Sequence, residues 1–153
     1  MGNLDINCMG FALNIEDWLT PYEDDWGVER EDTMMEMWDS GAPINEIYDV
    51  FLNADIDYLT TNYHLEVITE EEFKALPENH EVIAYRIGID YDPYEAGDVP
   101  DSDFHFKVRR NGQWYEKTGG AAPNKCDLET DKPWKAHDGL LYDSRIIYFV
   151  MAA

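Results

Sequence analysis

The dipeptide Asn111-Gly112 constrains the fold of this chain more than any other feature of its sequence. It separates two runs of alternating apolar and polar residues, 104–110 and 113–118. Asn-Gly between such runs is typical of a two-residue type I′ hairpin turn, and a turn of this kind also sets the register of its two strands. The predicted cross-strand pairs are His105 with Thr118, Lys107 with Glu116, and Arg109 with Trp114.

This register divides the side chains of the first hairpin strand between two faces of a sheet. Phe104, Phe106 and Val108 share one face, which we expect to lie on a hydrophobic core. His105 lies on the opposite face among polar groups, where we expect a packed helix to supply a partner for it.

The remaining patterns predict further strands in the second half of the chain and helices in the first. Residues 81–91 and 144–151 are rich in β-forming side chains, whereas residues 92–101 and 119–139 are predicted to be irregular. Apolar residues at helical spacing predict four helices, at 7–18, 31–39, 43–56 and 69–76.

Two of these helices have recognisable beginnings. Asn7 is suited to cap the first helix, and Thr69 with Glu72 forms a capping box for the fourth. Because the helices precede the strands, we predict an α+β fold in which N-terminal helices pack on a C-terminal antiparallel β-sheet. We expect a single domain over residues 1–153, with a helical half at about 1–77 and a sheet half at about 78–153.

Negative charge is concentrated in the predicted helical half. The chain carries 33 acidic and 11 basic side chains, a formal net charge of −22. Residues 1–73 hold 19 acids and one base, whereas residues 74–153 hold 14 acids and 10 bases. Such a chain lacks the cations that nonspecific nucleic-acid binding or attraction to an anionic membrane requires. The charge favours solubility, a cationic substrate or a basic protein partner.

The first residues, from Met1 to Ile6, have neither the basic nor the apolar segment of a signal peptide. Two cysteines, Cys8 and Cys126, are too few for a disulfide framework at this length. We therefore expect a cytoplasmic protein with free thiols, and export by a route without a signal peptide is compatible with the same sequence.

Cys8 and His105 are the candidates for nucleophilic catalysis. Cys8 directly follows the predicted N-cap Asn7, and the free N–H groups and dipole at a helix start favour a thiolate. The same N–H groups are suited to stabilise an oxyanion. A nucleophilic thiol also needs a base, and His105 is the candidate.

A third polar group is expected to hold the other nitrogen of the imidazole. The candidates are Glu116, which shares a face with His105 in the predicted hairpin, and Asp127 and Asn124, which follow it.

Two stretches resemble the papain-like cysteine peptidase and amidase superfamily. Asn7-Cys8-Met9-Gly10-Phe11-Ala12-Leu13 resembles the nucleophile segment of that superfamily, which includes NlpC-type cell-wall amidases. Asp103-Phe104-His105-Phe106, followed by Arg109, Gly112, Trp114, Lys117 and Gly119, is similar to the strand pair that carries the histidine in uncharacterised bacterial members. The chain departs from papain itself because too few residues precede Cys8 for a distant upstream glutamine in the oxyanion hole.

The resemblance implies a papain-like fold in a bacterial or phage hydrolase that uses no cofactor. It implies Cys8 as the nucleophile, His105 as the base, and Asp127 or Asn124 as the third catalytic member. The expected reaction is cleavage of an amide bond, in a peptide or a peptidoglycan stem, through an acyl-enzyme on Cys8. Asn7, Glu116 and Asn124 are further candidates for oxyanion-binding or orienting groups.

Metal sites are poorly supported. The spacing of a zinc site is missing from the set Cys8, His105, Cys126 and His137. The segment that begins at Asp90 starts like a calcium loop but has Glu95 and Asp101 where an EF-hand needs glycine and glutamate. We therefore predict no metal.

Two non-enzymatic functions are the alternatives. Carboxylates clustered at 23–25 and 29–32 are suited to an acidic inhibitor or nucleic-acid mimic that binds a basic protein. A papain-like fold without activity would serve as a binding module, and the acid-rich sequence around Cys8 favours that alternative because it opposes thiolate formation.

Overall fold

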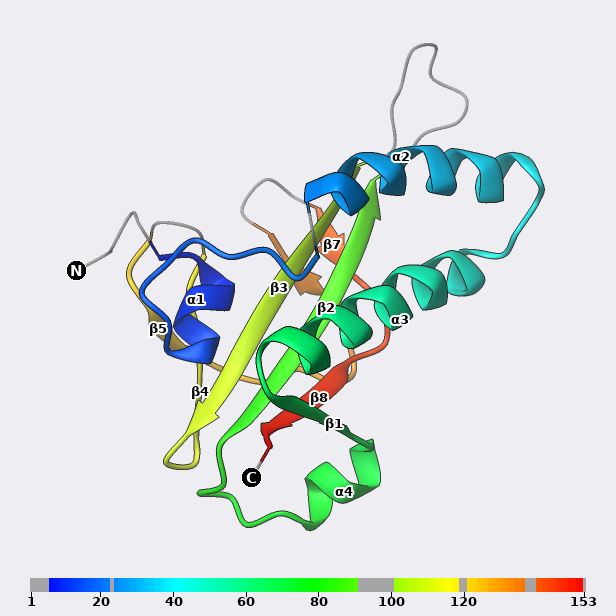
Figure 1. Cartoon of the computed structure of the whole chain (residues 1–153). Helices are drawn as coiled ribbons and strands as arrows, with labels where there is room; N and C mark the ends of the chain where they lie inside the picture. Colours follow the sequence, from blue (N-terminus) through cyan, green and yellow to red (C-terminus); the bar gives the residue numbers. More distant parts are fainter. Residues whose placement is uncertain (1–5, 23, 91–100, 119–120, 137–139, 153) are drawn as a thin grey trace.

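The computed structural model describes residues 6–22, 24–90, 101–118, 121–136 and 140–152 (Figure 1). This part of the chain is α+β. Its helices are α1 (Cys8–Leu13), α2 (Asp24–Asp39), α3 (Ile44–Asn62) and α4 (Glu70–Ala75). Its strands are β1 (Leu65–Ile68), β2 (Val82–Asp90), β3 (Asp101–Arg110), β4 (Gln113–Glu116), β5 (Asn124–Cys126), β6 (Trp134–Lys135), β7 (Leu141–Tyr142) and β8 (Ile147–Met151).

Six strands form one antiparallel sheet in the order β1-β8-β2-β3-β4-β5, and β6 and β7 form a separate two-stranded ribbon. The predicted hairpin is confirmed, with Lys107 opposite Glu116 and Arg109 opposite Trp114. Asn111 and Gly112 both have positive φ, at 52° and 79°, as a type I′ turn requires. The ladder between β3 and β4 ends at Glu116, so the predicted pair of His105 with Thr118 is not part of it.

The first helix is shorter than predicted. Asn14 adopts the left-handed conformation, with φ of 58°, and its N–H bonds back to the last carbonyls of α1, which ends the helix at Leu13. The prediction that this helix continues to Trp18 is therefore wrong, and the side chain of Trp18 is 53% exposed. Trp18 is at helical spacing from the apolar residues of the predicted helix. Because the chain reverses after Leu13, Trp18 does not join their buried face.

Two helices are longer than predicted, since α2 begins at Asp24 rather than at 31 and α3 continues to Asn62 rather than ending at 56. The other differences from prediction lie in short or irregular stretches. Strand β1 lies among the predicted helices, and it pairs with β8 at the end of the chain. Its four residues are too few to show an alternating pattern. The predicted loop at 92–101 lies outside the described residues except for its last position, which belongs to β3. The predicted capping box of α4 is confirmed, since Thr69 and Glu72 each bond to the other's backbone N–H.

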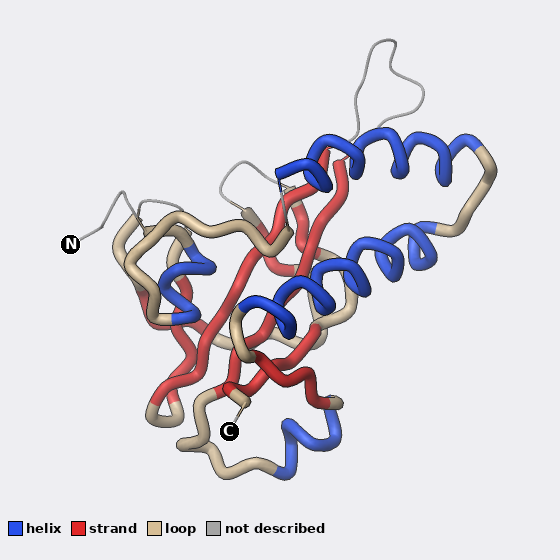
Figure 2. The backbone as a smooth tube through the Cα atoms, in the orientation of Figure 1, coloured by secondary structure: helices blue, strands red, loops and turns tan. Residues whose placement is uncertain are grey.

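Helices α1, α2 and α3 cover one face of the sheet (Figure 2). The apolar faces of α1 and α3 pack there on alternate residues of the central strands, such as Tyr85, Phe106 and Val108. This confirms the predicted inward face of β3. Burial of these side chains is the main source of stability on this side of the molecule.

The opposite face of the sheet carries buried cations between aromatic rings. Arg86, Lys107 and Arg109 are all at most 7% exposed. Their donors bind main-chain carbonyls of irregular segments rather than carboxylates. Trp134 lies under both Arg86 and Lys107, while Arg109 stacks on Phe73. These contacts hold α4 and the β6–β7 region against the sheet.

A buried ion pair joins α2 to α3. Arg30 is the single base among residues 1–73, and its guanidinium binds both carboxylate oxygens of Asp55, at 2.6 and 3.3 Å. The hydroxyl of Tyr85 on β2 donates to the same carboxylate at 2.6 Å. The guanidinium also lies over the rings of Tyr22 and Phe51. One carboxylate thus connects two helices and the sheet in a site without water access.

Asp55→Ala is expected to lower the free energy of unfolding by about 3–5 kcal/mol, because it leaves the Arg30 guanidinium buried and unpaired. Urea denaturation measures this change. The control is Asp57→Ala, an exposed carboxylate on the same helix, for which we expect a change within about 0.5 kcal/mol. Equal effects of the two variants would contradict a special role of the buried pair.

Candidate active site

Asn7 fixes the start of α1 and with it the position of Cys8. Its side-chain oxygen accepts from the N–H of Gly10 at 3.0 Å, as an N-cap does, and from the N–H of Leu19 at 3.1 Å. Its amide donates to the carbonyl of Leu19 at 2.6 Å. One buried side chain therefore holds both the helix that carries the thiol and the segment that returns past it.

The return segment crosses α1 at Gly10. A Cβ at this position would collide with the backbone carbonyl of Asp17 and would lie 2.8 Å from that of Ile15. Glycine is therefore required for the close approach. The crossing brings Trp18 and Thr20 to the cavity beside Cys8.

Cys8 lies at an open edge of β3. Its helix packs in the cluster that contains Phe106, so the expectation of a helix on the His105 face is wrong. The backbone N–H of Phe106 bonds to the thiol from the strand edge. Strand β4 stops at Glu116, so among the described residues no strand pairs with the first half of β3 on that side.

Glu116 holds the imidazole of His105. The distance from Nε2 of His105 to Oε1 of Glu116 is 2.8 Å, and the imidazole is buried. The ring stacks on Tyr142 at a centroid distance of 5.3 Å, and Trp134 packs against it edge-on. The hydrogen bond from His105 holds the pKa of Glu116 below its ordinary value, in opposition to burial.

The other candidates for the third group lie elsewhere. Asp127 is exposed, and its backbone carbonyl accepts from Lys107 at 2.7 Å. Asn124 is exposed on β5, and its amide donates to the carbonyl of Lys125. The side chain of Asn7 is occupied by the cap contacts. Of the candidates, Glu116 is therefore the residue that the fold brings to His105.

Cys8 and His105 line one cavity of about 330 Å³. The lining holds one thiol, one imidazole, several aromatic rings and one carboxylate. Its other lining residues are Asn7, Trp18, Thr20, Asp103, Phe104, Thr118 and Tyr142. Of these, Trp18 and Tyr142 belong to segments that the sequence analysis left outside the site, because no local pattern links them to Cys8.

The protein environment of the thiol opposes its ionisation. Burial raises the pKa of Cys8 to about 12, and the nearby charge of Asp103 acts in the same direction. Hydrogen bonding to the backbone N–H groups of Phe106, Met9 and Cys8 lowers the pKa of the thiol, without cancelling the effect of burial. At neutral pH the thiol of Cys8 is therefore neutral, and the expectation of a thiolate favoured by the helix start is not met.

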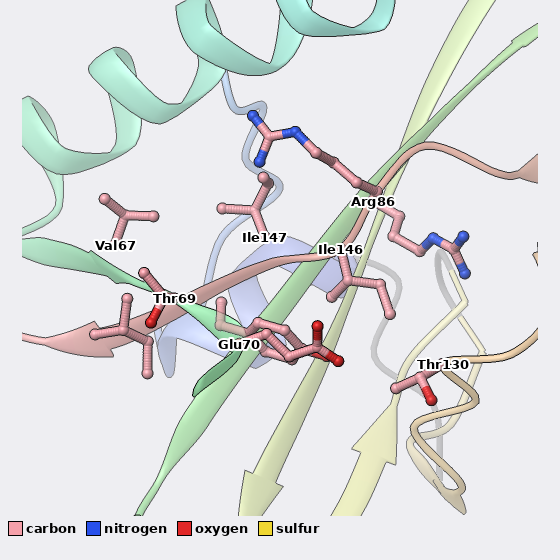
Figure 3. Close-up of a pocket in the computed structure, with 10 residues that line it drawn as sticks. Val67, Thr69, Glu70, Arg86, Thr130, Ile146 and Ile147 are labelled. Carbon is pink, nitrogen blue, oxygen red and sulfur yellow. The ribbon is translucent and has the colours of Figure 1, made fainter. Parts of the chain in front are cut away.

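A second cavity, of about 500 Å³, is lined by residues of β1, β2 and β8. Figure 3 shows Val67 and Thr130 at opposite ends of it, with Ile146 and Ile147 between them. Arg86 lines it, but Nε and Nη1 of its guanidinium already bind the carbonyls of Ser144 and Lys132. The lining holds neither cysteine nor histidine, so we place the candidate chemistry at the Cys8 cavity.

In the described part of the chain, no three His, Cys, Asp or Glu side chains are grouped as metal ligands. His137, one of the four possible zinc ligands, lies outside the described residues, as does most of the segment that starts like a calcium loop. Both cysteines are free thiols, with Cys8 buried and Cys126 partly exposed.

Comparisons with known proteins leave the family open. No family model matches the chain, and neither curated proteins nor solved structures include a significant match. None of the helices among the described residues has the length and apolar character needed to cross a membrane.

Asn7→Ala is expected to lower the free energy of unfolding by about 2–4 kcal/mol. The loss combines a helix cap with the hydrogen bonds that the Leu19 backbone would leave unmade. Asn7→Asp keeps the two acceptor contacts and loses the donor. Its free energy of unfolding is expected to lie between those of the wild type and the alanine variant. Urea unfolding orders the three proteins, and a wild-type value for Asn7→Ala would contradict this account of α1.

Proposed function

We propose that the protein is a cysteine hydrolase that cleaves an amide bond, with Cys8 as nucleophile, His105 as base and Glu116 as the group that orients the imidazole. The observation that carries the proposal is that Cys8 and the Glu116-bound imidazole line one cavity. The papain-like arrangement that the sequence resembles has the same chain order of cysteine, histidine and a polar third group.

The hydrogen bond to Glu116 selects the tautomer of His105. Because the pKa of Glu116 is held low, its side chain is a carboxylate at neutral pH and accepts only. Nε2 of His105 therefore carries the proton of the neutral ring, which leaves the lone pair on Nδ1. In the described part of the chain Nδ1 has no hydrogen-bond partner, so it is the atom suited to receive the thiol proton.

The proposed reaction conserves protons in two steps. The Cys8 proton moves to Nδ1 as sulfur attacks the carbonyl carbon, and the resulting imidazolium gives that proton to the leaving amine when the C–N bond breaks. Water then attacks the thioester while Nδ1 accepts its proton, the acid leaves and Cys8 regains its proton. Backbone N–H groups around the sulfur are the candidates to stabilise the oxyanion.

The raised thiol pKa requires that the base act during attack rather than beforehand. With a pKa of about 12, very little of Cys8 is thiolate at neutral pH, so a mechanism without His105 is slow. The same observation favours a second candidate function, a binding module of related fold in which the buried thiol is structural. An acylation experiment separates the two.

p-Nitrophenyl acetate is expected to transfer one acetyl group to Cys8, detected as a burst of nitrophenol and located by mass spectrometry. We expect His105→Ala to slow this acylation by about 10²–10⁴-fold. Cys126→Ser is the matched control, because Cys126 also has a pKa raised to about 12 and should contribute no burst. Equal acetylation of the two cysteines, or a burst that ignores His105, would overturn the hydrolase proposal in favour of the binding module.

Glu116→Gln is expected to slow the same acylation by about 10²-fold or more, because the amide no longer requires a proton on Nε2 and no longer stabilises an imidazolium. The acylation rate of Asp127→Asn, measured in the same way, decides whether Glu116 or Asp127 orients the imidazole. A larger loss in Asp127→Asn than in Glu116→Gln would assign the third position to Asp127.

A further inference from the structure

We propose that the Cys8 cavity selects substrates with a cationic group, an ammonium or a guanidinium, adjacent to the scissile amide, and that Asp103 binds this group. This inference rests on the proposed hydrolase. It names the substrate class of the same site and the residue that determines it.

Asp103 presents a fixed carboxylate to the cavity. It lies on β3 two residues before His105, and its side chain is exposed. Oδ2 accepts from the hydroxyl of Tyr142 at 2.8 Å, and Oδ1 accepts from the N–H of Phe104 at 2.8 Å. Two donors therefore set the direction of the carboxylate, and further lone pairs remain for a ligand.

The charges of the lining are one-sided. Asp103 is the one carboxylate among the described lining residues, and neither lysine nor arginine is among them. Lys117 is buried near Cys8, but its ammonium donates to the carbonyl of Ile6 and it is outside this lining. A ligand cation at Asp103 would thus meet neither a lysine nor an arginine in the lining.

Aromatic rings complete the cation site. Trp18, Phe104 and Tyr142 line the same cavity, and more than half of the Trp18 side chain is exposed. Aromatic faces attract ammonium and guanidinium groups, most strongly when the ring is indole. A docked substrate would also cover the Trp18 ring, which is otherwise left in water.

Asp103 is a cost to catalysis unless a ligand neutralises it. Its charge disfavours ionisation of the Cys8 thiol in the same cavity. A substrate cation paired with Asp103 removes this penalty at the moment of binding, so the correct substrate also makes the nucleophile easier to ionise. The excess of acid in residues 1–73 adds a long-range field that attracts cationic molecules.

The test uses pairs of fluorogenic peptide amides that differ only in lysine against norleucine, and in arginine against citrulline, placed on either side of the scissile bond. We expect the wild type to prefer the cationic member of at least one pair. Asp103→Asn is expected to lower kcat/KM for that substrate about 10- to 100-fold and to raise it for the neutral partner, because the charge that disfavours ionisation of the thiol is removed. For the same reason p-nitrophenyl acetate should acylate this variant faster than the wild type.

Asp143→Asn is the matched control. Asp143 is also an exposed carboxylate that accepts from a tyrosine, Tyr48, but it does not line the cavity. We expect it to keep the wild-type preference. No preference for the cationic substrate, or an equal loss for cationic and neutral substrates in Asp103→Asn, would overturn the inference.

A separate measurement keeps the two proposals distinguishable. If p-nitrophenyl acetate does not acylate Cys8, the hydrolase proposal fails, and binding then decides the inference alone. The lysine and norleucine peptides are titrated into Cys8→Ala by calorimetry. Tighter binding of the lysine peptide that is lost in Cys8→Ala/Asp103→Asn supports the cation site, and equal binding of both peptides overturns it.

Discussion

The second face of the sheet depends on buried cations that bind main-chain carbonyls. The segments around residues 77–80, 127–132 and 144 have few ladder hydrogen bonds of their own, and buried carbonyls without partners are costly. Arg109, Lys107 and Arg86 satisfy these carbonyls in turn. Although the chain has three acids for every base, these three buried cations bind main-chain carbonyls rather than carboxylates. They thereby hold a layer of irregular segments of the chain against this face of the sheet.

That layer is what encloses His105. Lys107 and Arg86 both contact Trp134, and Trp134 in turn packs edge-on against the imidazole. Tyr142 of β7 stacks on the same ring, so the imidazole lies between strand and ribbon. Helices α1, α2 and α3 are on the other face, and Cys8 lies near the edge of β3 beyond the end of β4. The candidate site thus requires two opposite layers and the end of one strand.

Local chemistry made part of this predictable. Asn111-Gly112 sets the β3–β4 register, and Thr69 with Glu72 sets the start of α4, because both depend on residues a few positions apart. The same register placed Glu116 on the face of His105. The end of α1 at Asn14 and the pairing of β1 with β8 were not predictable, since the first depends on a segment that crosses at Gly10 and the second on a partner at the other end of the chain. The approach of Trp18 and Tyr142 to Cys8 is nonlocal in the same sense.

The acidity of a thiol does not by itself distinguish the two cysteines. Burial raises the pKa of Cys8 and of Cys126 to about 12, so neither is a thiolate at neutral pH. Both are also near a carboxylate, Asp103 in one case and Glu116 in the other. In the proposed mechanism the difference lies in the base. Glu116 binds Nε2 of His105, which leaves Nδ1 of that ring to accept a proton, and His105 lines the same cavity as Cys8, whereas Cys126 is not in that lining. Reactivity at Cys8 would then depend on the imidazole lone pair rather than on the acidity of the thiol itself.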